Sequence, residues 1–446
     1  MTIVDVGRAL RERKVSVTEL AQEALAAAAR TNSSINAFIT ITEEAALKRA
    51  AELDEDLARG IDHGPLHGIP VAHKDAFYTK GVLTTAGAKI LSDFVPKQDA
   101  DLVARLHDAG AVMIGKTNLH ELCYGITSNN PHYGAVRNPW DLARIPGGSS
   151  GGSGAALAAG IVPLATGTDT GGSIRIPAAY CGVVGLKPTI GRQSCSGVVP
   201  LAVTLDHVGL MARTVRDVVI AFGAALPERP EVKGLRVGIP ENFFFDRLDP
   251  EVAASVRHAV QTAAGLGAEV TEIRLPEPAA LSTVGRLIQL AEAATVWKRY
   301  QDRRNDFGAD VYALLQQGLL IPATDYLNAQ RVREMLAGDF AKIWRSLDCL
   351  LTPVTAIPAA RIGEATVKIN GSEEDVRIAS TRLARPFNVL GWPALAMPCG
   401  FTSGRLPIGL QLVAPRDRED TLFRLGAALE DALALGGGGG LKPAAG

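Results

Sequence analysis

GTDTGGSIRIP, residues 167–177, places two adjacent glycines directly before Ser173. Glycine adopts backbone conformations that are closed to other residues, and it lets a ligand approach the main chain closely. The preceding stretch, IVPLAT (161–166), is typical of a short strand, and an apolar pattern resumes immediately after the serine. The sequence therefore predicts a tight loop that follows a strand, which suits either a linker or a site.

Segments on both sides of this loop alternate between helix and strand patterns. Residues 99–110 and 151–160 favour helices, whereas residues 111–114 (AVMI) favour a short buried strand. Near the end of the chain, residues 394–415 are typical of a hairpin with its turn at Ser403-Gly404, which makes a wholly parallel sheet unsuitable. We expect an α/β fold with a large mixed, mainly parallel β-sheet sandwiched by helices.

The composition excludes several classes of protein. Lys and Arg (46 residues) balance Asp and Glu (47), and the net charge of −1 gives no general field that would attract nucleic acid or an anionic membrane. The five cysteines are widely spread and form no C-x-x-C pair, which disfavours a disulfide framework or a zinc knuckle. The first residues, MTIVDVGRALRERKV, lack the pattern of a secretory signal, so we expect a cytoplasmic protein.

Two short patterns suggest chemistry that their surroundings do not support. GAVMIGKT (110–117) has the spacing of a phosphate-binding loop, but its middle residues fit the buried strand itself. GGSSGG (147–152) fits the elbow of a Ser-His-acid hydrolase, with His207 or His258 downstream, yet a loop rather than a strand precedes it. We expect neither a nucleotide site nor a histidine-based triad.

A third combination consists of Lys74, Ser149 and Ser173. A serine hydroxyl becomes an effective nucleophile when a base removes its proton, and a buried lysine with a lowered pKa can be that base. No histidine is then required.

These segments resemble the amidase signature family, whose hydrolases use a Ser-cisSer-Lys triad. The resemblance runs through GPLHGIPVAHKD, GKTNLHEL, RNPWDLARIPGGSSGGSGAALAAG, GTDTGGSIRIPAAYCGVVGLKPT and TLDHVG, and it returns in NVLGWPALAMPCGF and RLPIGLQLVAP. It covers nearly all of residues 1–215 and 385–430. Carried over, it implies Ser173 as the nucleophile, Ser149 as a bridging serine preceded by a cis peptide, and Lys74 as the final proton acceptor.

The glycine loop then has a catalytic explanation. The backbone N–H groups of Thr170, Gly171, Gly172 and Ser173 are expected to converge as an oxyanion hole, because the glycines permit a tight turn free of side chains. Asp169 and Arg175 flank this loop, and we expect an ion pair that braces it.

Other residues of the matching segments have supporting parts in this interpretation. Lys116, Asn118 and Glu121 in GKTNLHEL have the character of scaffold. His73 stands where many relatives carry an aliphatic or small residue; a protonated His73 would help to lower the pKa of Lys74, unless it simply packs outward.

The resemblance also sets expectations for organisation. We expect one domain over residues 1–435, with a signature core at about 60–215 and a variable substrate-specificity region at about 230–385. A charged, proline-containing stretch at 225–234 is the best candidate for an internal boundary. The tail 436–446 is glycine-rich and is predicted to be disordered.

The expected function is cleavage of C–N bonds in amides, anilides or carbamates, including aryl urethanes, through an acyl-enzyme and with ester cleavage as a side activity. Aromatic residues in the variable region, namely those of ENFFF (241–245), Trp297, Tyr300 and Trp344, together with the apolar GLLIP (318–322), favour an apolar or aryl pocket. The alternative is the glutaminase component of a tRNA-dependent amidotransferase, its A subunit, for which Arg331, Arg333, Arg382 and Arg385 are available to grip the substrate. We expect a small-molecule substrate, no cofactor or metal, no direct contact with nucleic acid or membrane, and a monomer or homodimer.

Overall fold

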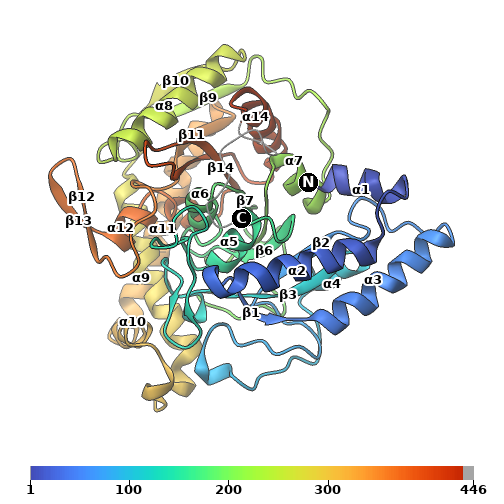
Figure 1. The fold of residues 1–446 in the computed structure, drawn as a ribbon. Coiled ribbons are helices and arrows are strands. Elements are labelled where there is room, and N and C mark those ends of the chain that lie inside the picture. Colours follow the sequence, from blue (N-terminus) through green and yellow to red (C-terminus); the bar gives the residue numbers. More distant parts are fainter. Residues whose placement is uncertain (1, 435–446) are drawn as a thin grey trace.

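The computed structural model describes residues 2–434, so the predicted glycine-rich tail lies outside the described residues (Figure 1). Within that range one sheet holds eleven strands. In spatial order these are β1 (Phe38–Ile41), β3 (Val112–Thr117), β2 (Pro70–Lys74), β6 (Leu164–Thr168), β8 (Val208–Ala212), β7 (Val184–Lys187), β14 (Ala394–Phe401), β15 (Pro407–Val413), β11 (Cys349–Pro353), β9 (Arg236–Pro240) and β10 (Glu269–Ile273).

The sheet is mixed, as predicted, but it is not mainly parallel. Parallel pairing joins β3, β2 and β6 on one side, and β11, β9 and β10 on the other. Every remaining neighbour is antiparallel: β1 with β3, and the run from β6 through β8, β7, β14 and β15 to β11. The predicted hairpin at 394–415 forms β14 and β15.

Helices cover both faces of the sheet, as expected. The helices α5 (Gly151–Ala158) and α6 (Arg175–Cys181) pack on one face, where Gly409 of β15 meets Ala179. The other face carries α7 (Val215–Phe222), α8 (Pro250–Gly265) and α14 (Glu419–Ala432), where Gly426 lies against Leu395 and Leu412. The first elements are α1 (Ile3–Arg11), α2 (Val17–Ile35), α3 (Glu43–Ala58) and α4 (Asp101–Asp108).

Residues 278–389 add a largely helical layer beside the sheet. It contains α9 (Pro278–Trp297), α10 (Ala309–Leu319), α11 (Ala323–Ala341), α12 (Val376–Thr381) and α13 (Pro386–Val389), and α9 packs against α10, α11 and α13. A two-stranded hairpin, β12 (Thr366–Ile369) with β13 (Ser372–Asp375), leads into α12 and projects at the left of Figure 1. A second small hairpin pairs β4 (Asn129–Asn130) with β5 (Gly134–Ala135).

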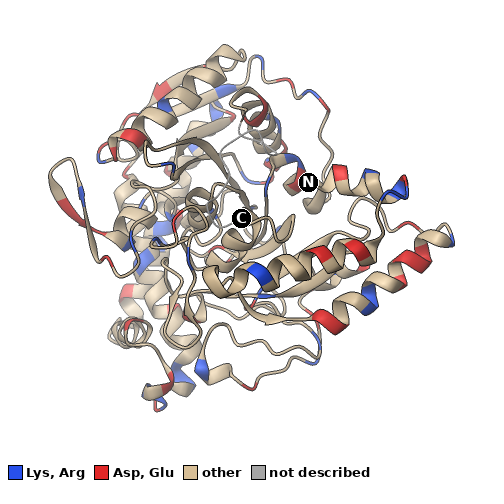
Figure 2. Ribbon diagram, viewed as in Figure 1, with Lys and Arg blue, Asp and Glu red and all other residues tan. Residues whose placement is uncertain are grey.

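The outer helices are charged, with both signs interspersed along α2, α3 and α8 (Figure 2). Helix α2 begins with a capping box, in which the side chains of Ser16 and Glu19 each accept from the other's backbone N–H. No helix within residues 2–434 is long and apolar enough to cross a membrane.

The topology brings two of the predicted chemical segments to one edge of the sheet. Strands β2 and β6 are parallel neighbours, so Lys74 and Thr168, the last residues of each, lie at the same end. Both strands are buried along their whole length. Loops beyond the carboxyl ends of parallel strands are common places for ligand sites.

Candidate active site

Lys74 ends β2 and is completely buried. Its side-chain nitrogen donates to two hydroxyls, to Ser149 Oγ at 2.8 Å and to Thr168 Oγ1 at 2.6 Å. Burial lowers the pKa of Lys74 below its ordinary value, although Cys123, Asp169 and Asp206 act in the opposite direction. The surroundings therefore favour a neutral amine that can accept a proton.

Ser149 lies just before α5, and the peptide bond between Gly148 and Ser149 is cis, as predicted. Gly148 is required here, since a Cβ at that position would lie 2.8 Å from the backbone carbon of Ile126. The hydroxyl of Ser128 donates to the carbonyl of Gly147 at 2.9 Å. These contacts fix the segment that carries the Ser149 hydroxyl.

Ser173 stands in the loop between β6 and α6 and is the member of the predicted triad that reaches a cavity. The N–H of Ser150 donates to the Ser173 carbonyl at 3.2 Å, so the two serine segments lie together. Among the described residues, the hydrogen bonds join Lys74 to Ser149 but do not continue to the Ser173 hydroxyl. Ser173 lines a cavity of about 480 Å³, a volume suited to a small ligand.

The predicted oxyanion loop needs one correction. The N–H of Gly172 donates to Asp169 Oδ1 at 2.7 Å, so it is committed to the loop and is not aimed at a substrate. The N–H groups of Thr170, Gly171 and Ser173 have no hydrogen-bond partner within residues 2–434. Gly172 is needed for its φ of +120°, and a Cβ there would lie 2.8 Å from Ala384.

The predicted ion pair does brace this loop. Arg175 bonds to both oxygens of Asp169 at 3.0 Å, and neither side chain is exposed. Asp169 also accepts from the Asn388 amide at 2.8 Å. Burial alone would raise the pKa of Asp169, but the charge and hydrogen bonds of Arg175 outweigh it and hold that pKa well below its usual range.

A second carboxylate fixes the other side of the loop. Asp206, in the TLDHVG segment, accepts from the Thr170 hydroxyl at 2.6 Å and from two backbone N–H groups. Burial raises the pKa of Asp206 to about 6. Sequence reasoning missed this residue and Thr168, although both lie inside segments that carry the resemblance.

The expected scaffold residues are confirmed as such. Lys116 of β3, the lysine of the phosphate-loop pattern, ends 3.1 Å from Asp75 Oδ1 in a fully buried ion pair. Asn118 and Glu121 bond to backbone groups of neighbouring segments. His207 lies against the Leu205 carbonyl, and His258 is exposed on α8, so neither contacts Ser149.

His73 does not assist Lys74 by carrying charge. Burial, with a smaller effect from Lys116, lowers the pKa of His73 to about 3, so the ring is neutral at physiological pH. Its Nδ1 lies 3.4 Å from the Thr166 hydroxyl, while its neighbour on the strand points to the opposite face. The idea of a protonated His73 beside Lys74 is therefore wrong.

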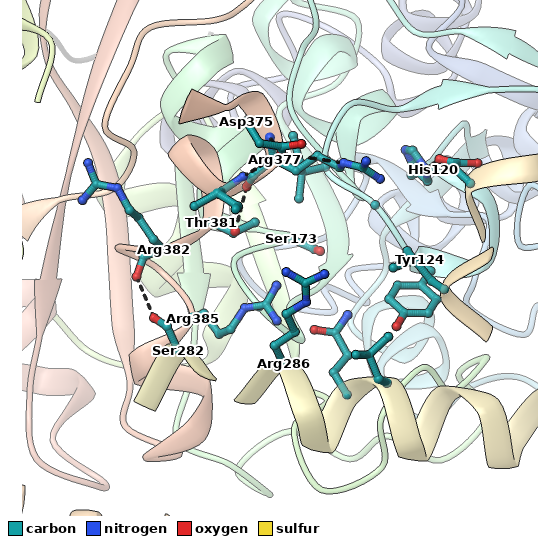
Figure 3. A pocket seen from close by; sticks show the side chains of 18 of the residues that line it. His120, Tyr124, Ser173, Ser282, Arg286, Asp375, Arg377, Thr381, Arg382 and Arg385 are labelled. Carbon is teal, nitrogen blue, oxygen red and sulfur yellow. Dashed lines mark hydrogen bonds and ion pairs between the residues drawn. The ribbon is translucent and has the colours of Figure 1, made fainter. Parts of the chain in front are cut away.

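Charged and polar side chains line the cavity at Ser173 together with apolar ones (Figure 3). None of the aromatic residues named from the sequence lines it. They pack elsewhere: Phe244 stacks on Phe387, Trp344 meets Trp392, and Trp297 meets Tyr300. The named rings therefore do not form the pocket, because they fill the cores beside and between the helices of residues 278–389; the aromatic and apolar lining comes instead from residues such as Tyr124, Leu290 and Leu314.

Arginines instead surround the cavity. Its lining includes Arg286 of α9 and Arg377, Arg382 and Arg385 from the segment around α12. Two of these, Arg382 and Arg385, were among the four arginines noted in the sequence. The other two lie in a separate hollow, where Arg333 donates to the carbonyls of Val389 and Thr204. No group of three His, Cys, Asp or Glu side chains within residues 2–434 is arranged to hold a metal ion.

Comparison with known proteins gives a consistent result over nearly the whole chain. The family model described as Amidase matches residues 19–423. The chain is 36% identical over 480 residues to the A subunit of the glutamyl-tRNA(Gln) amidotransferase of Alkaliphilus metalliredigens, with 98% of this chain and 97% of the relative covered. A crystal structure of an amidase superposes with a TM-score of 0.92 at 38% identity, covering 97% of this chain and 99% of that one. The substrate complex of 6-aminohexanoate cyclic dimer hydrolase gives a TM-score of 0.87 at 30% identity, covering 100% and 99%.

Proposed function

Because this chain belongs to the amidase family, we propose that it is a serine hydrolase that cleaves amide C–N bonds through an acyl-enzyme on Ser173. Lys74 is the base, and Ser149 relays the proton between Lys74 and Ser173. The observation that carries the proposal is the wholly buried Lys74 amine, 2.8 Å from the Ser149 hydroxyl.

Acylation begins when neutral Lys74 takes the Ser149 proton while Ser149 takes the proton of Ser173. The Ser173 oxygen bonds to the amide carbon, and the oxyanion accepts from the free N–H groups of the loop. The C–N bond then breaks, and the proton returns from Lys74 through Ser149 to the departing nitrogen.

Deacylation repeats the relay with water. Water loses a proton toward Lys74, its oxygen bonds to the acyl carbon, and the bond to Ser173 breaks as the proton returns to the serine oxygen. The products are a carboxylic acid and an amine or ammonia, and the enzyme regains neutral Lys74. Every proton that moves in these steps is carried by Lys74, Ser149, Ser173 or water, and no other reactant is needed.

The charged lining favours simple amides over the aryl carbamates and anilides expected from the sequence. Aromatic leaving groups gain from apolar and aromatic walls; this cavity has some apolar lining, but four arginines stand among its lining residues and none of the aromatic residues named from the sequence does. We therefore centre the proposal on linear amides.

A second candidate is the glutaminase component of a tRNA-dependent amidotransferase. The curated relatives favour it, since A subunits of glutamyl-tRNA(Gln) amidotransferases match at 36% and 38% identity over nearly the whole chain. Such a protein would release ammonia from glutamine for a partner protein.

Turnover of a substrate panel by the purified chain tests the proposal. We expect ammonia from primary amides without any added partner protein, and loss of that activity in Ser173→Ala. Turnover confined to glutamine, or appearing only when partner proteins are added, would favour the second candidate. Full activity in Ser173→Ala would contradict both.

A further inference from the structure

Two guanidinium groups point into the cavity beside Ser173 (Figure 3). Arg286 comes from α9, and Arg385 lies at the start of α13, so they reach the same place from different elements. Neither side chain has a hydrogen bond or an ion pair with any residue in the range 2–434. They differ in this respect from the other arginines of the cavity.

The position of Arg385 is set by two glycines. A Cβ at Gly285 of α9 would lie 3.3 Å from Arg385 Cγ and Cδ, so the aliphatic part of the arginine packs against that helix. A Cβ at Gly171 would lie 3.6 Å from Cζ, Nε and Nη2. The guanidinium therefore rests on the predicted oxyanion loop, two residues before Ser173.

The other charged side chains of the cavity already have hydrogen-bond or ion-pair partners. Asp375 caps α12 through the N–H of Arg377 and lies 3.8 Å from that guanidinium, and Asp310 accepts from His120 at 3.2 Å. Arg382 pairs with Glu374 at 3.0 Å, so its charge is compensated. Positive charge is thus left in excess at Arg286 and Arg385.

Two unpaired cations at one site repel each other. Burial is the main cause that lowers the pKa of Arg385 to about 10; Tyr124 acts in the opposite direction, and Arg286 lowers the pKa further by repulsion. Arg385 nevertheless stays charged at neutral pH. A bound anion would relieve this repulsion, and guanidinium groups bind carboxylates through paired N–H donors.

We propose that Arg385 and Arg286 form a carboxylate subsite, and that the natural substrate is an amide carrying a free carboxylate a few bonds from its scissile carbonyl. This inference rests on the proposed function of Ser173 and specifies its substrate. Because both aspartates of the cavity are engaged, the subsite selects acids without a neighbouring ammonium. The monoamides of short dicarboxylic acids have this chemistry.

The test compares acidic amides with neutral amides of matching shape. Succinamate and 4-oxopentanamide differ in that a carboxylate replaces a methyl ketone, and malonamate and glutaramate vary the length. We expect the wild-type kcat/KM for the best acidic amide to exceed that for 4-oxopentanamide by about 100-fold, as for a paired, charged hydrogen bond.

Arg385→Gln should lower kcat/KM for the acidic amide by about 10- to 100-fold, mainly through a higher KM. It should change kcat/KM for 4-oxopentanamide by less than about threefold. Arg286→Gln should act in the same direction with a smaller effect, because Arg286 is exposed. Arg331→Gln, which removes the same charge from the separate hollow, is the matched control and should change neither substrate.

Three outcomes are decisive. Equal turnover of acidic and neutral amides by the wild type would overturn the subsite. So would an equal loss of activity toward both substrates in an Arg385→Gln variant whose Ser173 still reacts with a fluorophosphonate. Preference for glutamine over every acid without an ammonium would also overturn it. Failure of the wild type to turn over any amide would instead contradict the proposed function.

Discussion

The amine of Lys74 lies 2.8 Å from the Ser149 hydroxyl and 2.6 Å from the Thr168 hydroxyl, in a place that no solvent reaches. Two hydroxyls on one nitrogen fix the direction of its lone pair. When the amine is neutral, donation to Thr168 leaves the lone pair directed at Ser149. In the proposed relay, Thr168 is thus a positioning residue.

Replacing Thr168 with valine keeps the shape of the side chain and removes the hydroxyl. We expect kcat to fall by about 10- to 100-fold with little change in KM, as for loss of one oriented hydrogen bond at a reacting group. The pH–rate profile should move to lower pH, because an acceptor that stabilises the ammonium is gone. Thr168→Ser should restore activity; a Val variant with an unmoved profile would show that the hydroxyl only packs.

Lys74 should also affect stability in a pH-dependent way. Its pKa is lowered in the folded chain and near 10.5 in the unfolded chain, so between these values the unfolded chain binds more protons and stability rises with pH. Lys74→Met lacks this dependence. Denaturant titration at pH 7 and 9.5 measures the unfolding free energy of both proteins. The variant should be more stable relative to the wild type at pH 7 than at pH 9.5, and an unchanged difference would contradict a lowered pKa.

Asp169→Asn should destabilise the protein strongly. The substitution leaves Arg175 as a buried charge without its partner, at a cost of about 3–5 kcal/mol. Chemical denaturation measures this cost, and activity should be lost with the loop geometry. Asp420→Asn breaks the exposed pair with Arg418 and is the matched control, expected to cost under about 1 kcal/mol. Equal costs for both variants would refute the bracing role.

Glu430 on α14 gives a prediction independent of catalysis. Burial raises the pKa of this carboxyl to about 8, so the folded chain binds more protons than the unfolded one and stability falls as pH rises from about 4.5 to 8. Glu430→Gln keeps an acceptor for the Val215 N–H, which lies 2.9 Å away. Its Tm relative to wild type should rise between pH 5 and 8.5, whereas the exposed Glu23→Gln should show no such trend.

Local patterns predicted the geometry around the proposed relay: the Lys74 amine lies beside the Ser149 hydroxyl, and the bond before Ser149 is cis. Ser173, Ser149 and Lys74 belong to short segments whose glycines and cis bond are set by nearby residues, and the Asp169–Arg175 pair spans only six positions. The strand directions were harder to predict, because the antiparallel run from β6 to β15 joins segments separated by more than two hundred residues. Register of that kind depends on packing across the whole sheet.

The sequence singled out Arg382 and Arg385 but could not predict how the cavity beside Ser173 is assembled. Arg286 and Arg385 are 99 positions apart and meet because α9 and α13 pack together, with Gly285 admitting the arginine side chain. The aromatic residues of the same region fit a core as well as a pocket, and Phe244 and Trp344 are packing residues in the structure. Gly172 likewise stands where the sequence predicts an oxyanion donor, yet its N–H donates to Asp169.

The rate of covalent labelling of Ser173 by a fluorophosphonate, followed by mass spectrometry across pH, tests the central claim most directly. We predict an adduct on Ser173 whose formation rate rises with pH as Lys74 loses its proton, and a rate slower by at least about 10³-fold and independent of pH in Lys74→Met. Labelling of Lys74→Met at the wild-type rate, or an adduct on another residue, would contradict the relay from Lys74 through Ser149 to Ser173.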